Sequence, residues 1–240
     1  MTGLTRRRSR RAARMRPGDS GPDEPRPVGR NSGVIDGVPM RARILGPAVA
    51  LLVWSCGPAS AVPVHEGDII FQTSRSAQSQ AVQAATHSRY SHMGLILFRN
   101  GEPFVLEAVA RVRFTPFKEW ADRGEGGRYL VKRLRDSRVL NDPARLSALR
   151  RAALSLAGRP YDPYFGWSDD RIYCSELVWK AYDRGVGIQL GSLAPLSTFD
   201  LSSQLVKTKL AERYGDKVPL GERVISPAVI FASPLLEEVP

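Results

Sequence analysis

The chain has 240 residues, 42% hydrophobic and 25% charged, which is enough for one folded domain with a proper core. Its net charge is +11, but residues 1–39 hold nine arginines against four acids, and Arg41 and Arg43 follow. The other 24 basic and 20 acidic residues leave only +4 for the rest of the chain. No basic stripe with interleaved aromatics occurs there, which argues against a nucleic-acid partner.

Residues 1–39 are rich in Arg, Pro and Gly and contain hardly any large apolar residues, so they cannot bury a core. We predict that this segment is disordered, or an upstream extension of the gene model with Met40 as the true start. Residues 40–61 have the pattern of a signal peptide: a basic start, an apolar run and a small-residue Ala-Ser-Ala site. The apolar run is too short to span a membrane comfortably. The prediction is a single exported domain over residues 62–240, periplasmic or secreted.

Cys56 leaves a second possibility for export. Residues 53–56 have the rough shape of a lipobox, so lipidation at Cys56 would anchor the protein to a membrane, although Trp54 fits this motif poorly. Cleavage after Ala61 would remove Cys56 and leave Cys174 as the single cysteine. A lone thiol in an oxidising compartment favours a reactive role.

A turn at residues 66–68 leads into a predicted strand over 69–71, with Asp68 as a turn or capping residue. Residues 76–85 predict a polar helix that begins at Ser76 and ends near His87. The polar residues of this helix could line a cleft or simply face solvent; they are Gln78, Ser79 and Gln83.

Two apolar runs, 92–98 and 104–109, flank Asn100-Gly101, which is a strong signal for a two-residue hairpin turn. That turn pairs Arg99 with Glu102. Counting back from the turn, Gly94 faces Glu107 and His92 faces Val109. Alternation along the strands then places His92 and Glu107 on one sheet face as diagonal neighbours, within reach of each other. This register predicts an imidazole oriented by a carboxylate, with His87 as the second choice of base.

The second half of the chain predicts mixed structure. We expect a turn and short helix over 114–120, a strand over 129–134, and a helix from Asp142-Pro143 to Gly158. The aromatic residues of 161–167 could wall a cleft or pack beneath their own loop. Residues 195–206 predict a short loop and helix. Residues 223–227 end a late strand, and the tail adds one more turn.

Cys174 lies at the start of a predicted amphipathic helix, whose apolar stripe includes Leu177, Val178 and Ala181. Asp169 and Asp170 lie just upstream, where a helix start is often signalled. Free backbone N–H groups and the helix dipole at this end stabilise a thiolate. The alternative is a buried structural cysteine. One cysteine and three scattered histidines lack the spacing of a zinc site, so we predict no metal and no cofactor.

The segments 67–71, 85–94, 107–108 and 173–178 resemble the permuted NlpC-type cysteine hydrolases, the YiiX/YebB-like branch of the papain-like amidases. Ser-His-Met-Gly and Tyr-Cys-Ser-Glu, in that order and far apart, carry the resemblance. It implies an α+β fold with a permuted papain-like core, in which an antiparallel sheet packs against the helix of the nucleophilic cysteine. By this resemblance Cys174 is the nucleophile, His92 the base and Glu107 the third polar residue.

Together these features predict a cysteine peptidase or amidase that cleaves an amide bond through an acyl-enzyme. The expected partner is a peptide or acyl-amide substrate, with cell-wall peptide as the leading class. Two alternatives remain open: a lipid-directed thiol acyltransferase or esterase, and a wall- or lipid-binding module without turnover.

Overall fold

The computed structural model describes residues 63–240. The predicted N-terminal extension over 1–39 and the signal peptide over 40–61, including Cys56, lie outside this range. Within 63–240, none of the helices combines the length and apolar character needed to cross a bilayer.

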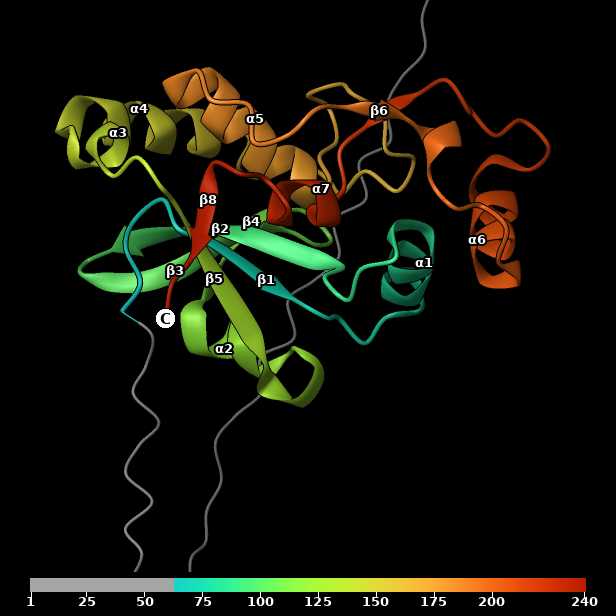
Figure 1. The fold of residues 1–240 in the computed structure, drawn as a ribbon, viewed down its shortest axis with the longest axis horizontal. Coiled ribbons are helices and arrows are strands. Elements are labelled where there is room, and N and C mark those ends of the chain that lie inside the picture. Colours follow the sequence, from blue (N-terminus) through green and yellow to red (C-terminus); the bar gives the residue numbers. More distant parts are fainter. Residues whose placement is uncertain (1–62) are drawn as a thin grey trace, which may run out of the picture. The chain divides into compact units, whose positions relative to one another are not determined.

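The described chain is built on a six-stranded antiparallel sheet in the order β4-β3-β2-β1-β5-β8 (Figure 1). Its strands are β1 (Ile69–Gln72), β2 (His92–Arg99), β3 (Glu102–Ala108), β4 (Val112–Pro116), β5 (Tyr129–Leu134) and β8 (Leu236–Glu238). A small two-stranded sheet pairs β6 (Ala194–Pro195) with β7 (Arg223–Val224).

The helices are α1 (Ala77–Thr86), α2 (Phe117–Asp122), α3 (Arg138–Asn141), α4 (Pro143–Leu154), α5 (Cys174–Val186), α6 (Gln204–Tyr214) and α7 (Pro227–Phe231), with short 3-10 turns η1 (Glu125–Gly127) and η2 (Leu196–Thr198). Helices α4 and α5 lie on one side of the sheet and α2 on the other, while α1 and α6 pack together at one end (Figure 1). This is the α+β arrangement that the sequence predicts.

Alternating strand residues fill two separate cores, one on each face of the sheet. Ile69 and Phe71 of β1 pack with α4 and α5, whereas Ile70 packs with Trp120 of α2. The same alternation runs along β2, where Leu95 faces α5 and its neighbour Ile96 belongs to the opposite cluster. A period of two is what a pleated strand imposes when both faces are covered.

Helices α4 and α5 approach each other closely at Gly185. A Cβ atom at this position would lie 2.5 Å from Leu149 Cα, so only glycine permits the contact. This close contact joins the C-terminal part of α5 to α4.

The hairpin between β2 and β3 has the predicted register. Arg99 pairs with Glu102 and Leu95 with Leu106. Extended by one residue, this register places Gly94 opposite Glu107. Asn100 and Gly101 both have positive φ, at 53° and 82°, as a two-residue hairpin turn of this hand requires. The helix cap at Ser76 is also confirmed, since its side chain accepts a hydrogen bond from Ser79 N.

Three local predictions were wrong. Residues 114–116 belong to strand β4 rather than to a turn, because they pair with β3. Helix α4 stops at Leu154 and continues only as turns toward Gly158. The tail forms the edge strand β8 beside β5, where tertiary pairing decides the structure of a segment with little propensity of its own.

Candidate active site

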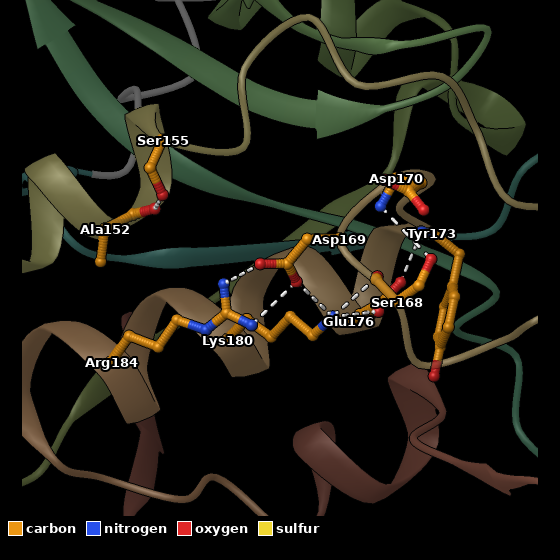
Figure 2. A network of polar contacts seen from close by, with 9 residues as sticks. All are labelled: Ala152, Ser155, Ser168, Asp169, Asp170, Tyr173, Glu176, Lys180 and Arg184. Atoms are coloured by element: carbon orange, nitrogen blue, oxygen red, sulfur yellow. Dashed lines mark hydrogen bonds and ion pairs between the residues drawn. The ribbon is translucent and has the colours of Figure 1, made fainter.

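Cys174 is the first residue of α5, with Tyr173 as the N-cap. Glu176 Oε2 accepts a hydrogen bond from Tyr173 N at 3.1 Å and so closes the first turn. The prediction that Cys174 lies at the start of this helix is therefore confirmed. Asp169 forms ion pairs with Lys180 and Arg184 along the helix (Figure 2). Cys174 is 7% exposed and its side chain is free of any disulfide.

His92 and Glu107 meet as the hairpin register predicts. His92 Nε2 lies 2.7 Å from Glu107 Oε2, and the Glu107 side chain is fully buried whereas that of His92 is 12% exposed. The His92 ring also stacks on Trp120, with ring centroids 5.9 Å apart. These contacts hold the ring in one orientation and leave Nδ1 as the nitrogen available to Cys174.

Glu107 has two further partners that sequence reasoning missed. Thr115 donates its hydroxyl proton to Glu107 Oε1 at 2.6 Å, and Arg123 forms an ion pair with the same oxygen. On β4, Arg113 pairs with Glu107 and Thr115 lies two residues further, on the same sheet face. Predicting β4 as a strand would therefore have placed Thr115 next to Glu107. No signal in the sequence points to Arg123, which reaches the site from the residue after α2.

The pKa values of His92 and Glu107 shift in opposite directions. Burial alone would lower the pKa of His92, but interactions with Cys174 and Glu107 outweigh it and raise this pKa to about 9. Burial would raise the pKa of Glu107, but His92, Thr115 and Arg123 together lower it to about 2. At neutral pH the site therefore holds a carboxylate next to an imidazolium.

A cavity of about 600 Å³ contains Cys174 and His92 on its wall. His92 belongs to the sheet face that packs on α2, but it is the first residue of β2, so it reaches the end of the sheet where α5 begins. Polar groups from α1 line the same cavity, including Gln78 and Ser79. Gln83 does not line it, because its amide turns to donate to Ser79 Oγ.

Some aromatic residues of the loop before α5 line the cavity, and others pack beneath the loop; the sequence left both possibilities open. Tyr161 and Phe165 line the cavity, whereas Trp167 packs beneath the loop against Trp179. The Tyr161 hydroxyl accepts a hydrogen bond from Gln78 Nε2 at 2.5 Å, so its own proton is free to be donated. Burial raises the pKa of Tyr161, and the nearby charge of Cys174 adds to this effect.

The other candidates lie apart from this cavity. His87, the alternative base, ends α1 with φ of 50° and pairs with Asp200 at 3.1 Å on the surface. Asp68 accepts a hydrogen bond from His65 N and pairs with Arg133, so its role is structural. His92 is thus the histidine that shares a cavity with Cys174.

Comparison with known proteins identifies relatives in Escherichia coli. The uncharacterised protein YiiX of strain K12 is 47% identical over 182 residues, which cover 76% of this chain and 89% of the relative. A crystal structure described as metalloprotein YiiX, from E. coli O157:H7, is 48% identical with a TM-score of 0.70 and covers 73% of this chain and 96% of that chain. Across residues 63–240, no group of three or more His, Cys, Asp or Glu side chains is placed to hold a metal ion.

A family of permuted papain-like amidase enzymes, described as "YaeF/YiiX, C92 family", matches residues 63–240. That range takes in the sheet, the hairpin with His92 and Glu107, and the helix that begins at Cys174. The chain therefore belongs to the permuted papain-like amidases of the YaeF/YiiX, C92 family.

Proposed function

We propose that this protein is an exported cysteine hydrolase that cleaves an amide bond through Cys174, His92 and Glu107. The observation that carries the proposal is the 2.7 Å contact between His92 and a fully buried Glu107, in the wall of the cavity that also holds Cys174. An activated nucleophile needs such a base, and the base needs a group that orients it. The relation to NlpC-type and YebB-like enzymes, indicated by the sequence motifs, is part of the same proposal.

The reaction follows from the ionisation of the site. The Cys174 thiolate attacks the carbonyl carbon of the substrate and forms a tetrahedral oxyanion. His92 then donates its Nδ1 proton to the amide nitrogen, the C–N bond breaks, and the amine leaves a thioester on Cys174. Water attacks the thioester while His92 takes one of its protons, so the acid product is released and the thiolate–imidazolium pair returns. Glu107 holds the ring and stabilises its positive charge throughout.

Two donors are placed to stabilise the oxyanion. The backbone N–H of Cys174 belongs to the first turn of α5, where N–H groups have no partner within the helix, and the Tyr161 hydroxyl has a free proton on the wall of the same cavity. Preorganised donors of this kind act where charge develops in the transition state. We assign them this shared role.

For the substrate, the predicted export favours a peptide amide of the cell wall. The signal-peptide pattern of residues 40–61 supports an exported enzyme, with lipidation at Cys56 as the alternative route to the membrane. The family match beginning at residue 63, two residues after the predicted cleavage site, agrees with either route.

A second candidate is an acyl amide or ester with an apolar chain, and the cavity lining favours it. Part of the wall is apolar and is contributed by α1, η2 and the segment around β7; its residues include Val82, Leu196, Phe199, Val224 and Pro227. Apolar walls with few polar groups suit an apolar ligand.

The experiment is a substrate screen with intact-protein mass spectrometry. The protein is mixed with wall-derived peptides and with acyl amides of increasing chain length, alongside Cys174→Ala. We expect product release and a transient acyl adduct on Cys174 in one of the two series. Turnover that persists in Cys174→Ala would rule out the nucleophile assignment, and the series that reacts decides the substrate class.

A further inference from the structure

Two buried ionisable side chains on α5 take no part in the proposed chemistry. Glu176 is 0% exposed and Lys180 is 1% exposed, and they lie one helical turn apart with Nζ 2.6 Å from Oε1 (Figure 2). Removing two charges from water is costly, and a hydrophobic pair of the same size is often at least as stable. Stability alone therefore does not explain why the helix that begins with Cys174 buries this pair.

Glu176 acts on the backbone at the nucleophile. Its Oε2 accepts the hydrogen bond from Tyr173 N, the residue directly before Cys174. On the other side of the same turn, Ser175 Oγ donates to Ile225 O and Ile225 N donates to Tyr173 Oη. The start of α5, and with it the Cys174 backbone N–H, is thus held from two directions.

Lys180 acts on the loop that walls the cavity. Its Nζ donates to Ser168 O at 2.9 Å and to Asp169 Oδ1 at 2.8 Å (Figure 2). The same Nζ lies 4.8 Å from the centre of the Trp167 ring. Arg184 fixes Asp169 from the outer side with contacts of 2.7 and 2.8 Å. This loop carries Phe165, whose ring packs edge-on against Tyr173, so Lys180 ties the cavity wall to α5.

The Glu176–Lys180 ion pair also determines the net charge buried next to Cys174. Glu176 Oε1 makes no hydrogen bond within residues 63–240, so the Lys180 ammonium is what compensates its charge. Burial raises the pKa of Glu176 to about 7, against the effect of Lys180 and the Tyr173 N–H. Asp162 and Tyr173 also face Glu176, while His92 and Tyr161 face Cys174. An unpaired carboxylate in this position would oppose formation of the thiolate two residues away.

We propose that Glu176 and Lys180 are positioning residues for the reaction of Cys174. Together they fix the backbone at Cys174 and the position of the loop that contains Trp167, Ser168 and Asp169. Because each neutralises the charge of the other, no uncompensated negative charge lies next to the Cys174 thiolate. This role rests on the proposed function only in taking Cys174 as the nucleophile.

The test compares Lys180→Met, Glu176→Gln and the double variant by following iodoacetamide alkylation of Cys174 against pH. Lys180→Met removes the ammonium that holds the pKa of Glu176 down, so Glu176 is an unpaired carboxylate only in the alkaline range. There its charge opposes the thiolate, and we expect the alkylation midpoint to rise, by up to about one pH unit. Glu176→Gln removes the carboxylate beneath Cys174 and leaves Lys180 paired with Asp169 alone, so the midpoint should fall. The double variant removes both charges and should return to within about 0.3 unit of the wild type, a recovery that loss of packing could not produce.

Lys209→Met is the matched control, because Lys209 pairs with Glu212 at 2.5 Å on the outer part of α6. It should leave the midpoint unchanged. Circular dichroism reports which variants fold, and if Lys180→Met does not, the shift in Glu176→Gln alone decides. A folded Glu176→Gln with the wild-type midpoint, or a double variant that matches Lys180→Met, would overturn the proposal. Alkylation needs no substrate, so this outcome is separate from failure of the proposed hydrolase activity, which Cys174→Ala tests.

Discussion

His92 Nε2 and Glu107 Oε2 lie 2.7 Å apart on neighbouring strands, and the buried carboxylate is also bonded to Thr115 and Arg123. One strand pair thus builds an imidazole with a fixed ring orientation and a stabilised positive charge. Three of the predictions below test this relationship, and the other two test Cys174 and Tyr161.

Cys174→Ala should lower turnover by at least about 10³-fold, because no other thiol is available in the described cavity to form the acyl-enzyme. The thermal unfolding midpoint should change little, since alanine removes one atom from a side chain at the cavity wall. The measurement is turnover of a verified substrate beside a thermal melt. Wild-type activity in the variant would exclude Cys174 as nucleophile.

Glu107→Gln should reduce kcat by less than His92→Ala, for which we expect about 10²- to 10⁴-fold. The variant keeps the size of the side chain but loses the charge that raises the pKa of His92. Activity of the wild type should fall on the alkaline side as pH passes about 9, where the imidazolium loses its proton. In Glu107→Gln this alkaline limb should move to lower pH.

The control for this experiment is Glu102→Gln, an exposed carboxylate at the hairpin turn. It should show the wild-type pH–rate profile. Identical profiles for the two glutamine variants would mean that Glu107 does not act on His92.

Folding stability should depend on pH through the same pair. The pKa of His92 is raised from 6.5 to about 9, so its contribution to the free energy of unfolding is complete below pH 6.5 and is lost as pH rises through 9. The pKa of Glu107 is lowered from 4.5 to about 2, so its contribution is present above pH 4.5 and is lost as pH falls through 2. Urea unfolding of wild type and His92→Gln should therefore differ most between pH 4.5 and 6.5. A difference that stays constant up to pH 10 would contradict this linkage.

Thr115→Val should destabilise the fold by about 1–3 kcal/mol, because it leaves a buried Glu107 oxygen with one hydrogen bond fewer. Urea unfolding at pH 6 measures the loss. The matched control is Thr198→Val, since Thr198 donates to Pro195 O at the surface and its loss should change the free energy of unfolding by less than about 0.5 kcal/mol. Equal effects in the two variants would mean that the Thr115 bond adds nothing specific.

Tyr161→Phe should lower kcat by about 10²- to 10³-fold with little change in KM, because the hydroxyl is assigned to the oxyanion and not to substrate binding. Tyr129→Phe is the control, since Tyr129 lies on β5 and packs on Phe117, away from the cavity lining. If Tyr161→Phe raised KM and left kcat unchanged, the hydroxyl would act in substrate binding rather than on the oxyanion.

The amino-acid sequence by itself determined the parts of the site that depend on local geometry. Asn100-Gly101 accepts positive φ at both positions, so the turn sets the register, and a period of two then brings His92 and Glu107 to one face. A period of 3.6 likewise placed Cys174 on the buried side of its helix. These rules act over a few residues and need no knowledge of the rest of the chain.

Only the tertiary structure decided which distant groups surround that pair. The start of α5 meets the start of β2 because α4 and α5 pack together on one face of the sheet, a result of the whole core rather than of any local pattern. Tertiary packing likewise buries Glu176 and Lys180, brings Arg123 to Glu107, and pairs the tail as β8. Such contacts join residues far apart in the chain, and their free energy depends on shape and charge that no single segment contains.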